Sequence, residues 1–202
     1  ADMKTAVGTC TWNVDIGMAD SVSFTVGLMV NGYYTRNNSA DNEVVTVFKP
    51  GINSINGGGF LVNSNSPAGS LAGDPGRKTN FGFNVKYNKT GKNLQGNINV
   101  IIRQGPRTYQ IKGNVMSSLA VQPSPCTNPT TTAPCMAVFN GKASLQDITD
   151  PLNPVSLDGN ATLQVNMTDK GDPGSMDTIG ITVWNKNGGL YMQPTGRQQQ
   201  PS

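Results

Sequence analysis

Strict alternation of apolar and polar side chains is the feature that most constrains what this chain can fold into. In "NFGFNVKY", residues 80–87, every second side chain is apolar: Phe81, Phe83, Val85 and Tyr87. A period of two predicts a half-buried β-strand, because successive side chains of a strand point to opposite faces of the sheet. The alternation returns in six further segments between residues 94 and 192, whereas no window combines a 3.6-residue period with helix caps.

The connections between these segments are mostly short. "NKTGKN" and "QGPR" have the length and the residues of hairpin turns, which favours an antiparallel meander. Such a sheet has one apolar face, so it must fold over a dry interior and leave its other face wet. The predicted fold class is therefore all-β, an antiparallel β-sandwich or flattened barrel. The composition agrees, since only 13% of the residues are charged and 24 Gly and 13 Pro suit many tight turns.

Residues 1–49 carry a separate group of β signals, "SVSFTVGLMV" and "EVVTVFK". They amount to half of the ~100 residues of an immunoglobulin-like domain, so we expect a partial immunoglobulin-like β segment with Trp12 as its core aromatic. Its missing strands lie upstream, or it pairs with another chain or with the domain that follows. We further expect a Gly-rich linker at residues 50–59, with the triplet Gly57, Gly58 and Gly59 as a hinge, and a β-sandwich module at residues 60–202.

The chain has three cysteines, Cys10, Cys126 and Cys135. Cys126 and Cys135 enclose the Pro- and Thr-rich loop "CTNPTTTAPC", and we predict that they form a disulfide, because neighbouring exposed thiols do not persist in an oxidising compartment. Cys10 has no partner that the sequence identifies. A C-x8-C spacing in a chain without histidine is a poor zinc signature.

The residue types of the chain do not favour a catalytic site. The absence of histidine excludes nucleophilic triads that use it. A carboxylate pair of the glycosidase kind would have to come from Asp147, Asp150, Asp169, Asp172 and Asp177. Aromatic residues make up only 6% of the chain, and most lie on strand faces that need a core, so few are left for a sugar cleft. We therefore predict that the chain is not an enzyme.

The run "TDKGDPGSMDTIG" raises a cation-binding hypothesis instead. It holds Asp169, Asp172 and Asp177 in a turning loop, and calcium binds several oxygen atoms in such loops. Asp147 and Asp150 would join this site if they lay at the same end of the sheet. The competing hypothesis is that these aspartates only cap turns through side-chain-to-backbone hydrogen bonds.

Charge and hydropathy bear on the partners. The net charge is +3, and the basic residues are scattered rather than gathered in a stripe interleaved with stacking aromatics, so no nucleic-acid partner is expected. No stretch reaches the ~18 apolar residues of a membrane span.

Several segments also resemble a known family. "GGGFLVNSNSPAG", "KTNFGFNVKYNKTGKNLQGNINVIIR", "YQIKGN", "FNGKASLQDITDPLNP" and "TDKGDPGSMDTIGITVWNKNGG" are similar to the post-COAP-1-like module, which occurs near the C-terminal part of large secreted bacterial surface proteins. The similarity covers about residues 50–192, and residues 1–49 resemble the closing strands of the PKD-like or immunoglobulin-like repeat that typically precedes the module. The resemblance implies an extracellular or cell-surface location and supplies no catalytic residues.

These observations predict a non-catalytic surface module with a structural or adhesive role. One form of it is a self-assembling subunit of a filament or surface layer, whose partners are other copies or neighbouring β domains that add strands to the sheet. The alternative is an adhesin domain that binds surface glycans or calcium. An accessory domain of a glycoside hydrolase is a more remote hypothesis.

Overall fold

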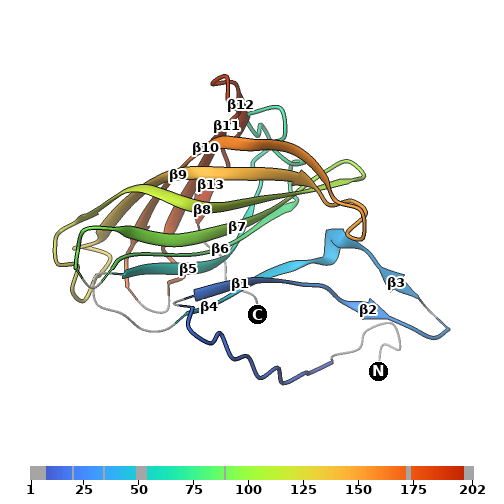
Figure 1. Ribbon diagram of the computed structural model, residues 1–202, viewed down its shortest axis with the longest axis horizontal. Helices are drawn as coiled ribbons and strands as arrows, with labels where there is room; N and C mark the ends of the chain where they lie inside the picture. Colours follow the sequence, from blue (N-terminus) through green and yellow to red (C-terminus); the bar gives the residue numbers. More distant parts are fainter. Residues whose placement is uncertain are drawn as a thin grey trace.

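Figure 1 shows the computed structural model, which describes residues 8–19, 21–33, 35–48, 54–88, 90–171 and 174–197. Most of these residues form one nine-stranded antiparallel sheet. Its strands are β5 (Ser54–Val62), β6 (Lys78–Tyr87), β7 (Leu94–Gln104), β8 (Arg107–Gln122), β9 (Cys135–Asp147), β10 (Val155–Asp169), β11 (Thr178–Trp184), β12 (Leu190–Met192) and β13 (Thr195–Arg197). Strands β5 to β12 pair in chain order, and β13 pairs with β11. The all-β antiparallel prediction is confirmed.

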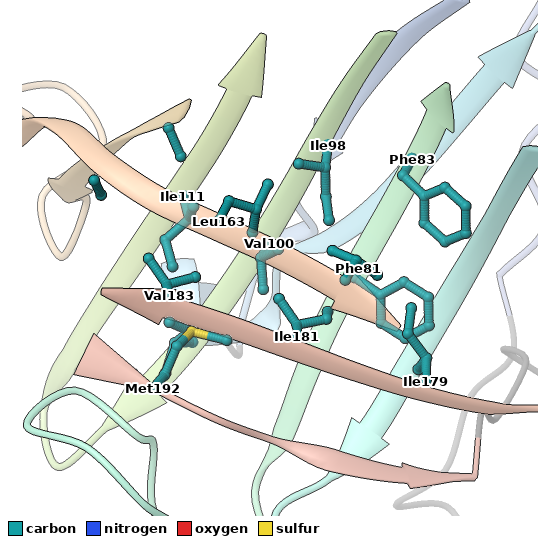
Figure 2. Packing of buried hydrophobic residues seen from close by; sticks show 14 of the residues in the cluster. Phe81, Phe83, Ile98, Val100, Ile111, Leu163, Ile179, Ile181, Val183 and Met192 are labelled. Atoms are coloured by element: carbon teal, nitrogen blue, oxygen red, sulfur yellow. The ribbon is translucent and has the colours of Figure 1, made fainter. Parts of the chain in front are cut away.

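The sheet curls around its apolar face and forms a half-barrel. Figure 2 shows Ile179, Ile181 and Val183 of β11 packed across the interior from Phe81 of β6 and Val100 of β7. The apolar side chains of the alternation face the interior, where Phe81, Phe83 and Val85 are almost fully inaccessible to solvent. Burial of this face supplies the main driving force for folding.

One end of the curled sheet is closed by the connection between β5 and β6. Within this connection, the Leu71 N–H donates to the Tyr191 carbonyl at 2.7 Å, and the Ser70 N–H donates to the Leu190 carbonyl at 3.2 Å. These bonds use backbone groups of β12, the short strand at one end of the sheet order. Strand β5 forms the other end of that order, and β13 contacts it without pairing among the described residues.

The N-terminal residues form a ribbon on the outer face of the sheet. The N-terminal ribbon consists of β1 (Ser21–Val26) and β4 (Glu43–Phe48), an antiparallel pair. Between them lie the small hairpin of β2 (Met29–Val30) and β3 (Arg36–Asn37) and the 3₁₀ turn η1 (Ser39–Asp41). Figure 1 shows the ribbon beneath β5, β6 and β7. Of the arrangements that the sequence left open, the segment therefore packs on the domain that follows it.

The ribbon changes the expected character of the outer face. We expected this face to be wet, but Asn80, Asn99 and Gln110 are buried there. Their amides find partners across the interface: Asn99 Nδ2 donates to Thr25 Oγ1 at 3.2 Å and Gln110 Nε2 donates to the same atom at 2.8 Å. The expectation fails because the hydrogen-bonding groups of a polar sheet face can pair with polar side chains of a covering segment as well as with water.

Trp12 is not a core residue, contrary to the expectation. Its side chain is 51% exposed and contacts Phe24 edge-on, with 4.7 Å between the ring centroids. A small core of its own is therefore not what holds the N-terminal segment in place.

The hinge and linker predictions are wrong for the described residues. Gly57, Gly58 and Gly59 lie inside β5, opposite Phe83, Gly82 and Phe81 of β6. A Cβ atom at Gly57 would lie 2.7 Å from Cζ of Phe83, so this glycine makes room for an aromatic ring rather than for a bend. Only residues 50–53 of the expected linker lie outside the described residues.

Candidate functional site

A cavity of about 1040 Å³ occupies the open end of the curled sheet. Strands β5 and β6 line one side of it, and β8 to β11 line the other. Its apolar floor is formed by Ile55, Phe83, Leu119, Met167 and Ile179, which come from five different strands. Open mouths of curled or closed sheets are common binding sites, because they combine an apolar interior with polar loop residues.

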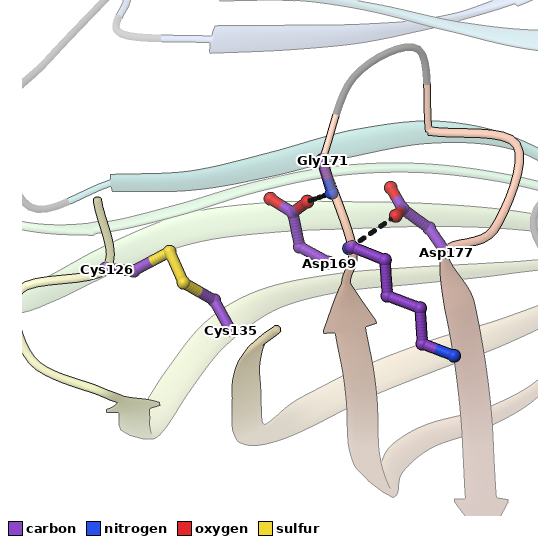
Figure 3. The surroundings of a disulfide bond; sticks show 6 residues. Cys126, Cys135, Asp169, Gly171 and Asp177 are labelled. Carbon is purple, nitrogen blue, oxygen red and sulfur yellow. Dashed lines mark hydrogen bonds between the residues drawn. A yellow bond between two sulfur atoms is a disulfide. The ribbon is translucent and has the colours of Figure 1, made fainter. Parts of the chain in front are cut away.

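The polar rim of this cavity contains two of the three aspartates of the cation hypothesis. Asp169 Oδ1 accepts the Gly171 N–H at 2.8 Å, and Asp177 Oδ1 accepts the Lys170 N–H at 2.8 Å. Figure 3 shows both carboxylates directed at the backbone of the loop that joins β10 to β11. These contacts are the turn-capping bonds of the competing hypothesis.

Asp172 lies outside the described residues. Across the part of the chain that the structure describes, no group of three or more His, Cys, Asp or Glu residues is arranged to hold a metal ion. Asp169 and Asp177 are nevertheless brought together at the rim, so calcium in this loop stays a prediction.

The predicted disulfide is confirmed and fixes the neighbouring rim loop. Cys126 and Cys135 are bonded, with 5.8 Å between their Cα atoms. Cys135 also pairs with Asp169 in the β9–β10 register, so the disulfide lies beside the aspartate loop (Figure 3).

The two rim loops touch at Gly171, a contact that sequence reasoning missed. Gly171 has φ +98°, and a Cβ atom there would lie 2.5 Å from the Pro129 carbonyl oxygen. A residue with a side chain is disfavoured at this φ, so the glycine permits both the turn and the close approach. The glycine itself was the only signal in the sequence, and it did not identify which loop would approach it.

Asp147 and Asp150 do not join this site. In the β9–β10 pair, Asp169 faces Cys135 at one end and Asp147 faces Val155 at the other. Strand β9 has 13 residues, which at ~3.3 Å per residue separates the two ends by roughly 40 Å. Asp147 instead accepts the Arg107 Nη1 donor at 2.9 Å at the far end of the sheet.

The aspartates at the far end also serve turns. Burial raises the pKa of Asp147, but hydrogen bonds from Thr149 and Arg107 outweigh it, so the pKa lies below its usual range. The pKa of Asp150 is lowered mainly by the Asn153 amide and the Leu152 N–H. Neither carboxyl has the raised pKa that a general acid needs near neutral pH.

Asp158 is a buried carboxyl that sequence reasoning missed. It accepts the Asn160 N–H at 2.8 Å, the Lys186 N–H at 3.2 Å and the Tyr191 hydroxyl at 3.1 Å. The Asn160 N–H is the main cause that lowers the pKa of Asp158, whereas burial and then Asp158 raise the pKa of Tyr191. Asp158 therefore ties the irregular start of β10 to the turn that follows β11.

Comparisons of the chain with protein-family models, with curated proteins and with solved structures gave no match. No helix among the described residues is long and apolar enough to cross a membrane.

Proposed function

We propose that the chain is a non-catalytic module of an extracellular surface protein, and that its structural or adhesive role is exerted through the open end of the curled sheet. The observation that carries this proposal is the cavity of about 1040 Å³, which has an apolar floor and a polar rim. A cavity of this kind can hold a partner without any reactive group.

The rim residues support binding rather than catalysis. Asp169 and Asp177 are each bonded to a backbone N–H of their own loop, so their charge is used to hold the loop. The disulfide between Cys126 and Cys135 fixes the other loop and is compatible with an oxidising, extracellular environment. A fixed rim lowers the conformational entropy that a partner must remove on binding.

Strand β5 supports a partner that binds by extending the sheet. It stands at one end of the strand order and borders the cavity. The border of a sheet is a template for another strand, either from a neighbouring domain or from a second copy. This favours the structural, self-assembling form of the proposal.

The adhesive alternative has its own supporting observation. Half-buried Tyr87 lines the cavity together with rim residues Thr168, Thr178 and Asp169. An aromatic ring beside hydroxyl and carboxylate groups can hold a sugar ring, so surface glycans are the second candidate ligand.

Two measurements on the same protein test the proposal. Sedimentation velocity over a wide concentration range reports self-association, and a glycan array reports adhesion. We expect the wild type to be positive in one of them and the Val121→Arg variant to lose that signal, because Val121 lines the cavity near the end of β8. Val115→Arg is the matched control, since Val115 lies on the same strand, is 57% exposed and does not line the cavity.

The proposal is wrong if the wild type is monomeric at every concentration and binds no glycan. It is also wrong if Val121→Arg and Val115→Arg behave alike, because the open end would then play no part. Release of reducing sugar from a polysaccharide would contradict the non-catalytic assignment.

A further inference from the structure

The open end of the curled sheet is acidic, although the chain as a whole is basic. The chain has 15 Lys and Arg against 12 Asp and Glu, which gives a net charge of +3. Among the described residues that line the cavity, the only charged ones are Asp169 and Asp177. The charge of the cavity lining is therefore opposite in sign to the net charge of the chain.

Asp169 continues the apolar row on the inner face of β10. Val165, Met167 and Asp169 are two residues apart, so their side chains point to the same face of the sheet. Val165 belongs to the buried core, Met167 packs against that core, and Asp169 is exposed and lines the cavity. The inner face of this strand therefore leads from an apolar interior to a carboxylate at the rim.

The Asp169 carboxylate can accept more hydrogen bonds than it receives. Its Oδ1 accepts the Gly171 N–H at 2.8 Å, and its Oδ2 has no partner among the described residues. An ionised carboxylate has about four acceptor positions, so this group can take a further donor.

A cationic donor would also reduce the repulsion between the two rim carboxylates. Thr168 lies opposite Thr178 in the last pair of the β10–β11 register, and Asp169 and Asp177 flank this pair. Figure 3 shows the two carboxylates at the same end of these strands. Like charges that face each other on neighbouring strands are destabilising, so a positive charge is favoured beside them.

The apolar part of the cavity has the size and the surface of a small-molecule site. Its volume is about 1040 Å³, and small-molecule sites have roughly 300–1,000 Å³. Ile55, Leu119, Val121 and Met167 line it and are half-buried, so part of their surface faces the cavity. An apolar ligand would remove this surface from water, and the flexible thioether of Met167 adapts to ligands of different shape.

We propose that the open end binds a small apolar amine, with its body on the half-buried apolar residues and its ammonium group on the Asp169 carboxylate. This inference rests on the proposed function and names the class of ligand for the same cavity. An aliphatic amine is protonated at neutral pH, and hydrogen bonds between two charged groups are among the strongest in proteins. An apolar anion such as a fatty acid would instead meet two like charges.

The first test compares three probes that share one ring and differ in the polar group. Naphthylmethylamine, naphthylmethanol and naphthalene carboxylate are titrated into the full chain by calorimetry, at low ionic strength and with EDTA present. We expect the amine to bind about fivefold more tightly than the alcohol, as one exposed ion pair allows, and the carboxylate to bind most weakly. The net charge of +3 predicts the opposite order. Equal binding of amine and alcohol, tighter binding of the carboxylate, or no binding of any probe overturns the inference.

The second test removes the charge of the rim with a matched control. Asp169→Asn keeps an oxygen that can accept the Gly171 N–H, and we expect this variant to bind the amine and the alcohol equally. Asp150→Asn changes the net charge by the same amount at the far end of the sheet, where Asp150 is exposed and accepts the Leu152 N–H at 3.0 Å. It should keep the preference for the amine. Binding of the alcohol shows that each variant is folded, and equal effects of the two substitutions refute the role of Asp169.

The third test locates the ligand and separates the inference from the proposed function. In an isotope-labelled chain, the amine should shift the amide resonances of Thr168, Asp169 and Thr178, leave that of Leu152 unchanged, and produce no shifts in Val121→Arg. Shifts confined to the far end refute the site. If Val121→Arg abolishes self-association or glycan binding but the amine causes no shifts, the inference fails and the proposed function stands. If the amine binds at the rim of a chain that is monomeric and binds no glycan, the inference stands and the structural or adhesive role fails.

Discussion

Arg103 links the sheet to the backbone that joins β1 to β4 of the N-terminal ribbon, and its loss should be costly. The side chain is 4% exposed. Its Nε donates to the Ala40 carbonyl at 2.5 Å, one Nη donates to the Asn42 carbonyl, and the other donates to the Lys78 carbonyl at 3.0 Å and to Asn80 Oδ1 at 2.5 Å. Burial lowers the pKa of Arg103, and nearby Glu43 and Asp41 oppose this.

The expected loss of stability follows from these bonds. Two of the four run from the sheet to the backbone beside β4, and a hydrogen bond to a charged group contributes about 1.5–3 kcal/mol net. These two bonds together give about 3–6 kcal/mol, and removing one partner of a buried charged network typically costs about 3–5 kcal/mol. We therefore expect Arg103→Met, which keeps the aliphatic stem, to lower the free energy of unfolding by about 3–5 kcal/mol.

Urea unfolding followed by circular dichroism measures this change. Arg107→Met is the matched control, because Arg107 pairs with Asp147 at 2.9 Å but its side chain is 61% exposed. An exposed ion pair contributes at most about 1 kcal/mol, so the control should change little. Equal effects of the two substitutions, or a loss below about 1 kcal/mol in Arg103→Met, would show that the buried network does not hold the ribbon.

The remaining predictions concern the rim loops, a buried carboxyl and the packing of the ribbon. Replacing Cys126 and Cys135 by alanine should lower the free energy of unfolding by about 2–3 kcal/mol in urea melts, because the bridge spans a separation of nine residues; an unchanged midpoint would contradict this. Asp158 has a lowered pKa in the folded state, so its stabilising effect is present above the ordinary pKa of ~3.9 and is lost as the pH falls through the folded value. Asp158→Asn should therefore reduce the melting temperature at pH 7, and a difference from the wild type that persists at pH 2 would refute this account. Chelation with EDTA should leave the melting temperature unchanged if the aspartates of the rim only cap their loop, whereas a fall would place a cation there. Gly82→Val should cost about 1–3 kcal/mol in the same urea assay, since a Cβ atom at this position collides with Thr46 of the ribbon, and full stability would show that the ribbon is held elsewhere.

The strands could be predicted from the sequence because their signal is local. The alternation over residues 80–87 identifies which side chains of β6 enter the core without knowledge of any other strand. The meander could also be predicted, since short turns leave neighbouring strands no choice but to pair. The hypothesis that Asp147 joins Asp169 in one cation site could have been rejected from the sequence. Consecutive loops of a meander lie at opposite ends of the sheet, and these two aspartates belong to consecutive loops.

The open end could not be predicted because it depends on how strongly the sheet curls. Register shifts interrupt the β8–β9 pair between Gly113 and Val115 and the β9–β10 pair between Asp158 and Ala161. Irregularities of this kind increase the twist and bend of a sheet, and no residue pattern in the sequence marks them. The position of the Cys126–Cys135 disulfide at the cavity rim follows from the same curvature, although the bond itself was predictable.

The polar, weakly charged outer face explains why the position of the ribbon escaped sequence reasoning and why Arg103 matters. Asn, Thr and Gln side chains can face water or be buried, provided that each finds a hydrogen-bond partner. A typical bond of this kind contributes only about 1 kcal/mol net. Not every buried amide of this face finds a partner, because Asn84 Nδ2 is buried without one among the described residues. The face also carries an apolar contact, because Val44 of β4 packs with Ile101 and Ile148 in a buried cluster. Docking of the ribbon therefore depends on the Arg103 guanidinium, on the hydrogen bond from Asn80 to the Glu43 carboxylate and on this apolar cluster together.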